Sequence, residues 1–233
     1  MSDHIVSAYD NELSTLAGRI AEMGGIAETI VNNAVSALVT RDLELARATI
    51  EQDRRLDDLL QEIEMRLIEI IARRQPMGKD LREIVSAGRI ANDLERVGDM
   101  AKNIAKRVIA IDAGMNSKKL AIGVEHMTEL ALNQLKSVLD AYTGHDDKAA
   151  VKVRDNDAEV DAIYTSLFRE LLTYMMEDPR NITQCAHLLF CAKNIERIGD
   201  HATNIAENVY YMVTGERLPE DRPRVDEMSV SVE

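Results

Sequence analysis

Apolar residues recur every three or four positions along almost the whole chain, with polar residues between them. This period is typical of amphipathic helices, and the strict alternation that indicates strands is nearly absent. Each helix has one apolar stripe, which it must bury against its neighbours. The pattern predicts six helices, at about residues 7–40, 42–74, 79–112, 117–143, 146–177 and 181–214.

Capping and turn residues fall at corresponding places in the two halves of the chain. Asp42 and Asp146 are suited to begin the second helix of each half, because an aspartate can accept hydrogen bonds from the free N–H groups there. Pro76 and Pro179 close the same two helices, since a proline disfavours α conformation in the residue before it. The chain therefore divides into two successive groups of three helices.

One phrase of fifteen residues occurs twice, as ANDLERVGDMAKNIA at 91–105 and as AKNIERIGDHATNIA at 192–206, with nine identities. Positions before the phrase align at an offset of 104, and the phrase itself aligns at an offset of 101. Self-similarity at a fixed distance indicates two copies of one structural unit. Short connections place sequence neighbours antiparallel, as in helical bundles.

These patterns predict an all-α protein made of two tandem three-helix bundles. The first bundle spans residues 1–114, the second spans 115–215, and 216–233 form a mobile tail with two prolines and little to bury. The 233 residues include no Trp and only two Phe, so aliphatic residues and methionine must fill the core.

The formal net charge of −13 argues against nucleic acid as a partner, since phosphate affinity comes largely from Lys and Arg. It suits cation binding or a basic partner, and it also suits a protein kept in solution by its negative surface. Cys185 and Cys191 lie too far apart around one helix to pair with each other. Together with the lack of an apolar signal segment, this indicates the cytoplasm.

Acidic residues four positions apart recur at equivalent places on two helices of each half. This spacing puts both side chains on one face of a helix. Composition alone predicts about seven such pairs, so a single pair carries little information and the duplication carries the signal. The pairs are Asp53 with Asp57 and Glu95 with Asp99 in the first half, and Asp157 with Asp161 and Glu196 with Asp200 in the second.

Four carboxylates from two adjacent helices form an oxygen-rich ligand set. Such a set suits Mg²⁺, Mn²⁺, Ca²⁺ or iron better than zinc, which prefers His and Cys. Asn103 and Asn204 could add amide oxygens. On a helical wheel Glu95, Asp99 and Asn103 lie roughly opposite the apolar seam, which predicts an open outer surface. The alternative interpretation is a solvated acidic face without a ligand.

Gly98 and Gly199 lie in the middle of helices, where glycine costs about 1 kcal/mol relative to alanine. Their repetition indicates a close approach to the backbone, either by a neighbouring helix or by a ligand. His201 lies five residues from Glu196, which is the wrong spacing for a ferritin-type di-iron site. No phosphate-binding loop, dinucleotide-binding motif or nucleophile elbow occurs, so we do not expect an enzyme.

The paired ERxGDxAxNIA segments, each preceded in its half by a helix with DxxxD, resemble the PhoU family of bacterial phosphate uptake. The resemblance covers about residues 5–215. The second-helix motif uses the shorter Asp at both positions, a slight departure from the commoner E/DxxxD form. It implies two three-helix bundles, a homodimer, and bound Fe, Mg²⁺ or Mn²⁺. The implied metal ligands are Asp53, Asp57, Glu95, Asp99, Asp157, Asp161, Glu196 and Asp200.

PhoU-like proteins restrain the phosphate-starvation response when phosphate is plentiful. They link the ATPase subunit of the phosphate ABC transporter to a membrane sensor histidine kinase. The resemblance therefore implies a cytoplasmic, non-enzymatic negative regulator that reaches the membrane through these partners. Two alternatives stay open: a metal-storing carboxylate bundle, and a helical scaffold whose acidic pairs only face water.

Overall fold

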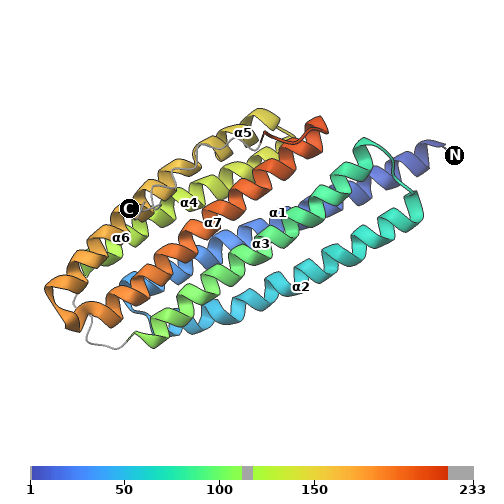
Figure 1. Ribbon diagram of the computed structural model, residues 1–233. Coiled ribbons are helices and arrows are strands. Elements are labelled where there is room, and N and C mark those ends of the chain that lie inside the picture. The colour runs from blue at the N-terminus through green and yellow to red at the C-terminus, as the bar shows by residue number, and fades with distance from the viewer. Residues whose placement is uncertain (1, 112–117, 220–233) are drawn as a thin grey trace.

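The computed structural model describes residues 2–111 and 118–219, and almost all of this part is helical. The long helices run parallel or antiparallel to one axis (Figure 1). The elements in order are α1 (Ser2–Thr40), α2 (Leu43–Arg74), α3 (Lys79–Ala110), α4 (Lys118–Gly144), α5 (Asp147–Asp155), α6 (Asp157–Glu177), the 3₁₀ helix η1 (Pro179–Asn181) and α7 (Ile182–Thr214).

Two three-helix bundles lie side by side (Figure 1). Helices α1, α2 and α3 form the first bundle, and the second consists of α4, the pair α5–α6, and α7. The bundles meet where α3 packs against α7 and α1 packs against α4. Helix α2 lies at one edge of the molecule and α5 and α6 lie at the opposite edge. The expectation of an all-α protein with two bundles is confirmed.

The predicted helix N-caps are formed at equivalent places in the two bundles. The Asp42 carboxylate accepts hydrogen bonds from the N–H groups of Glu44 and Leu45 at 3.0 and 2.9 Å. The Asp146 carboxylate accepts one from the N–H of Ala149 at 2.9 Å. Each bond satisfies a donor that the first turn of a helix leaves free. The starts of α2 and α5 are therefore encoded locally.

The predicted helix 146–177 is interrupted at Asn156, which separates α5 from α6. The Asn156 carbonyl accepts the backbone N–H of Glu159 at 3.2 Å, three residues on, in place of the usual bond four residues on. It also accepts a hydrogen bond from the Gln134 side-chain amide of α4 at 3.2 Å. A bond from another helix leaves no trace in apolar periodicity, so the sequence predicts one continuous helix here.

The predicted core seam of α3 is buried, and so is its counterpart in α7. Burying an aliphatic side chain contributes about 1.5–3 kcal/mol, so these two stripes fix which faces of α3 and α7 point inward. The buried residues are Ile90, Leu94, Val97, Ala101, Ile104 and Val108 in α3, and Ile195, Ile198, Ala202, Ile205 and Val209 in α7.

Polar contacts also cross between the bundles. The Nδ1 atom of His201 on α7 lies 3.0 Å from a carboxylate oxygen of Asp93 on α3. The guanidinium of Arg107 lies 4.5 Å from the ring centre of Phe190, close enough for a cation–π interaction. These contacts join α3 to α7, and His201 therefore links the two bundles.

The predicted tail falls mostly outside the described residues, since the structure describes 216–219 of the range 216–233.

Candidate cation-binding clusters

The first acidic cluster consists of Asp53 and Asp57 on α2 and Glu95 and Asp99 on α3. Asp53 is 2% exposed, and the side chains of Glu95 and Asp99 are 18% and 30% exposed. The charges of Asp53, Asp57 and Asp99 all act on Glu95. The structure thus brings the four predicted residues of the first half together in the groove between α2 and α3.

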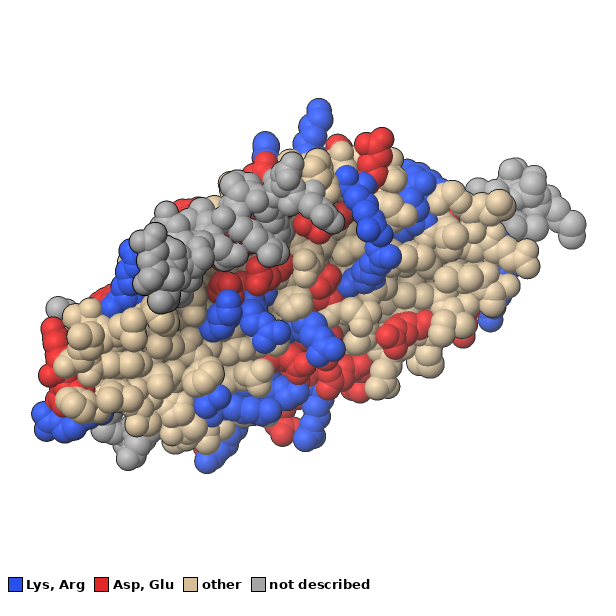
Figure 2. Space-filling view, in the orientation of Figure 1, with Lys and Arg blue, Asp and Glu red and all other residues tan. Residues whose placement is uncertain are grey.

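The helical-wheel expectation of an open outer surface is correct for Asn103, which is exposed, whereas Glu95 and Asp99 are only partly exposed. A wheel drawn for α3 alone omits α2, which covers this side of α3. In Figure 2 acidic side chains gather with lysines and arginines near the middle of the face formed by α2 and α3. The first cluster is a half-buried groove with a charged rim.

Lys102 on α3 neutralises this groove from inside. Its Nζ lies 2.5 Å from Oδ2 of Asp53 and 3.3 Å from Oδ1 of Asp99, so one ammonium bridges carboxylates of α2 and α3. Arg96 approaches Glu95 and Asp99 from the rim, at 3.5 and 3.4 Å. The chain therefore supplies a cation of its own between Asp53 and Asp99.

Burial and charge move the pKa values of this cluster. Burial raises the pKa of the Asp53 carboxyl, the hydrogen bond from Lys102 opposes this rise, and the charges of Asp57 and Asp99 add to it. Burial, and next the charge of Asp99, raise the pKa of Glu95. The hydrogen bond to Asp53 raises the pKa of Lys102. Lys102 consequently stays charged, and the carboxylates carry a cost for being ionised.

The four corresponding residues of the second half, called here the second cluster, are Asp157 and Asp161 on α6 and Glu196 and Asp200 on α7. Asp157 is the first residue of α6, where free backbone N–H groups favour negative charge. The Glu196 side chain is 13% exposed and lies 2.6 Å from Nζ of Lys193, whose own side chain is 50% exposed. The charge of Asp200 also acts on Lys193. The second cluster therefore has its lysine at the solvent-facing rim.

Among the positions that line the two clusters, two inner ones differ in charge or polarity. Thr203 stands where the repeat places Lys102 in the first half, and its hydroxyl bonds the Gly199 carbonyl at 3.2 Å. Gln134 stands where the first half has Ile30. Gln134 is 8% exposed, and within the described chain its Oε1 has no hydrogen-bond partner. Sequence reasoning missed both residues, although the aligned repeats show where the copies differ.

Side chains from neighbouring helices lie directly over both mid-helix glycines. A Cβ atom at Gly98 would lie 3.0 Å from Oδ1 of Asp53 and closer still to the Leu56 side chain. One at Gly199 would lie 3.2 Å from Oε1 of Gln134 and 3.7 Å from Oδ1 of Asp157. Of the two alternatives for these glycines, close packing of a neighbouring helix accounts for both.

Comparison with known proteins identifies the family. The PhoU domain model matches residues 20–108 and 124–209, one match in each bundle. The chain belongs to the PhoU family. A relative named phosphate-specific transport system accessory protein PhoU homolog, from Rhizobium meliloti, is 60% identical over 223 residues, which cover 96% of this chain and 94% of the relative. A relative of the same name from Caulobacter vibrioides is 49% identical over 229 residues, covering 98% and 100%.

Solved PhoU structures share the fold. The crystal structure of PhoU from Pseudomonas aeruginosa matches with a TM-score of 0.85 at 38% identity, covering 89% of this chain and 100% of that one. That of the phosphate transport system regulatory protein PhoU from Streptococcus pneumoniae matches with a TM-score of 0.84 at 27% identity, covering 91% and 99%. Membership of this family of regulatory proteins confirms the expectation that the chain is not an enzyme.

The metals that the PhoU family implies fit the two clusters unequally. Across residues 2–111 and 118–219, no three Asp, Glu, His or Cys side chains are arranged to hold one metal ion. In the first cluster the Lys102 ammonium occupies the space between two carboxylates. In the second, Gln134 adds a neutral oxygen without a partner. The eight predicted metal ligands remain a prediction.

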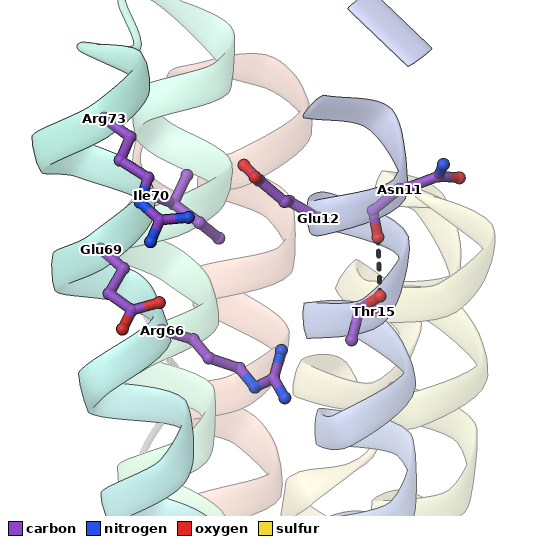
Figure 3. Close-up of a pocket in the computed structure, with 7 residues that line it drawn as sticks. All are labelled: Asn11, Glu12, Thr15, Arg66, Glu69, Ile70 and Arg73. Carbon is purple, nitrogen blue, oxygen red and sulfur yellow. Dashed lines mark hydrogen bonds between the residues drawn. The ribbon is translucent and has the colours of Figure 1, made fainter. Parts of the chain in front are cut away.

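Other grooves lie away from both clusters. Figure 3 shows one of about 250 Å³ between α1 and α2, where Arg66 and Arg73 face Glu12 across the opening. Arg74 holds Glu12 with two hydrogen bonds of 2.8 and 3.0 Å. A second groove, of about 620 Å³, lies between α3 and α7, and Asn204 lines it. In the described part of the chain, no helix is both long enough and apolar enough to span a bilayer.

Proposed function

We propose that this PhoU-family chain is a cytoplasmic adaptor that restrains the phosphate-starvation response when phosphate is plentiful. In this proposal it links the ATPase subunit of the phosphate ABC transporter to a sensor histidine kinase. It acts as a homodimer and reaches the membrane through these partners. The observation that carries the proposal is the match of both bundles to the PhoU domain, together with 60% identity to an accessory protein of phosphate-specific transport.

The surface of the outer helices supports a docking role. Ile68 on α2 and Leu172 on α6 occupy equivalent positions in the repeat, and they are 68% and 40% exposed. Met65 and Met176, near them on the same two helices, are 60% and 85% exposed. Each outer helix thus carries an exposed apolar pair, and the two pairs lie at opposite edges of the molecule. Neighbouring exposed apolar side chains commonly mark protein contacts, and methionine adapts well to different partners.

Deleting the gene tests the regulatory role. The proposal predicts that a phosphate-starvation promoter fused to a reporter becomes active in phosphate-rich medium, and that the wild-type gene restores its repression. A reporter that stays repressed in the deletion strain would contradict the proposal. Phosphate uptake measured in the same strain separates an effect on the transporter from an effect on the kinase.

A pull-down from membranes tests the partners. Wild-type protein should retain the transporter ATPase and the sensor kinase at high phosphate. Ile68→Lys should lose at least one of them, because it places a charge on an apolar docking surface. Ala48→Lys, an exposed change far along the same helix, adds the same single positive charge and is the matched control. Equal recovery by both variants would rule out the α2 surface as a docking site.

A further inference from the structure

Two guanidinium groups on α2, those of Arg66 and Arg73, line the groove between α1 and α2 (Figure 3). Within the described residues neither forms an ion pair, although Glu69 lies only three or four residues from each on the same helix. Most other arginines of the first bundle contact a carboxylate, at 2.7–3.4 Å, and these are Arg19, Arg47, Arg54, Arg55, Arg74 and Arg96. The groove therefore holds two positive charges that the described chain does not pair.

The carboxylates around the groove do not offset these charges fully. Glu12 on α1 accepts two hydrogen bonds from Arg74, at 2.8 and 3.0 Å, so its charge is matched by a third arginine. Among the residues that line the groove, Glu69 is then left against both Arg66 and Arg73. A local excess of positive charge attracts anions, and here it lies on a chain whose formal net charge is −13.

The corresponding surface of the second bundle has the opposite charge. At the repeat offset of 104, Glu170 and Glu177 on α6 occupy the positions of Arg66 and Arg73. All four of these residues are exposed. The arginine pair is therefore a property of the first bundle, and the duplication of the structural unit does not account for it.

The size and lining of the groove indicate the class of ligand. Its volume of about 250 Å³ lies below the roughly 300–1,000 Å³ that is usual for pockets of drug-sized molecules. Arg66 and Arg73 are seven residues apart, which places them on one face of α2, and the buried Ile70 lines the groove between them. Guanidinium groups donate several N–H bonds in one plane, a geometry that matches the oxygens of phosphate and similar anions.

We propose that the groove between α1 and α2 binds one small oxyanion of the phosphate or sulfate type, with the guanidinium groups of Arg66 and Arg73 as its donors. Figure 3 shows the Arg66 side chain extending from α2 toward α1, so a bound anion would also join the two helices. Both arginines are exposed, and binding should therefore weaken as added salt screens their charges. This site lies away from both acidic clusters and does not depend on the adaptor function.

NMR spectroscopy of the arginine Nε–H groups in the isotope-labelled full-length chain tests this site. Inorganic phosphate, added at constant pH and ionic strength, should shift the signals of Arg66 and Arg73 along one saturable curve. The signal that disappears in Arg66→Gln, and the one that disappears in Arg73→Gln, identify the two groups. Each variant should weaken phosphate binding about tenfold or more, because hydrogen bonds to a charged ligand are lost.

Two further variants sharpen the test. Arg47→Gln is the matched control, because Arg47 is an exposed arginine of the same helix that pairs with Glu44 at 2.7 Å. It should leave phosphate binding unchanged. Glu69→Gln removes a negative charge from the lining of the groove, so it should tighten phosphate binding about twofold.

Titrations with sulfate and with glycerol phosphate distinguish two sources of the anion. Weaker binding of glycerol phosphate than of the two inorganic anions supports a free oxyanion as the ligand. The reverse order supports a phosphate group carried by a larger molecule at the same two arginines.

Two results would overturn the site. They are signals of Arg66 and Arg73 that do not shift or that shift without saturation, and a loss of phosphate binding in Arg47→Gln as large as that in Arg66→Gln. Circular dichroism verifies that each variant is folded before its binding is compared. Neither result bears on the reporter experiment, so failure of the anion site is distinguishable from failure of the proposed regulatory function.

Discussion

The grooves of the first and second bundles hold the same four carboxylate positions and neutralise them in different ways. Between α2 and α3, Lys102 lies inside the groove and contacts Asp53 and Asp99. Between α6 and α7, Lys193 lies at the rim and contacts Glu196, and Thr203 takes the inner position. Exchanges at equivalent positions of the repeat therefore place the neutralising ammonium inside one groove and at the rim of the other.

The outer helices that carry these carboxylates also differ between the two bundles. Helix α2 is continuous from Leu43 to Arg74, whereas its counterpart is broken at Asn156. At the break Gln134 donates to the Asn156 carbonyl, and Asp157 is the first residue of α6. The side-chain oxygen of the same Gln134 lies near Gly199 of α7.

The largest effect should come from removing the inner lysine. Lys102→Met leaves Asp53 buried without its partner, so we expect unfolding free energy to fall by about 2–3 kcal/mol, measured by urea denaturation. Thr203→Val at the equivalent position removes a single neutral hydrogen bond and should cost less than about 1 kcal/mol.

A second change in the same groove serves as the control for this comparison. Asp53→Asn combined with Lys102→Met should regain most of the lost stability, because no buried charge is left unpaired. Similar losses for Lys102→Met and Thr203→Val would show that the ammonium does not hold α2 to α3.

Alanine substitutions at the two mid-helix glycines should differ less in their effect on stability. In Gly98→Ala the new methyl group meets the fully buried Leu56 side chain and the Asp53 carboxylate, so we expect a loss of about 1–2 kcal/mol despite better helix propensity. Gly199→Ala meets less crowded neighbours and should lose under about 1 kcal/mol. Thermal denaturation of both variants measures the difference.

Gly25→Ala is the matched control for helix propensity. Gly25 is exposed in the middle of α1, and an added Cβ would have no neighbour within 4 Å. This variant should gain up to about 1 kcal/mol. A gain in stability of the same size for Gly98→Ala would mean that α2 does not pack closely against α3 at Gly98.

The smallest effect concerns the two glutamates and depends on pH. The pKa of Glu95 is raised in the folded state, so the folded chain binds this proton more tightly than the unfolded chain does. The contribution of Glu95 to folding stability is then highest below the ordinary glutamate pKa, and it falls as pH rises through the raised pKa of the folded state. At neutral pH Glu95→Gln should therefore be more stable than wild type, by about 0.5 kcal/mol.

Glu196→Gln provides the contrast, because it removes the ion pair with the half-exposed Lys193 and should cost about 0.3 kcal/mol at neutral pH. Urea midpoints measured from acidic to neutral pH check both variants. The advantage of Glu95→Gln should disappear once the pH lies below the ordinary glutamate pKa. A constant advantage at every pH would mean that charge is not its cause.

The features that sequence predicts well here are local or repeated ones. Asp42 and Asp146 cap helices through bonds to residues two or three positions away. The duplicated phrase placed equivalent carboxylates on equivalent helices, and the structure brings those of the first half together. A cap and a repeat can both be read from residues close in sequence or at a fixed offset.

What sequence could not supply depends on contacts between distant helices. Asp53 is buried because α3 packs over it, and Lys102 bridges to it across 49 positions. At the break, the Asn156 carbonyl accepts from a donor that lies 22 positions earlier, on α4. Periodicity reports which face of one helix is apolar, and it holds no information about which polar side chain the neighbouring helix presents.

A crystal structure of the full-length chain tests the central claim most directly, namely that the first groove holds its neutralising ammonium inside and the second holds it at the rim. The account predicts Lys102 between Asp53 and Asp99, and Lys193 against Glu196 with Thr203 at the inner position. A Lys102 side chain that points to solvent and leaves Asp53 without a cation would contradict it.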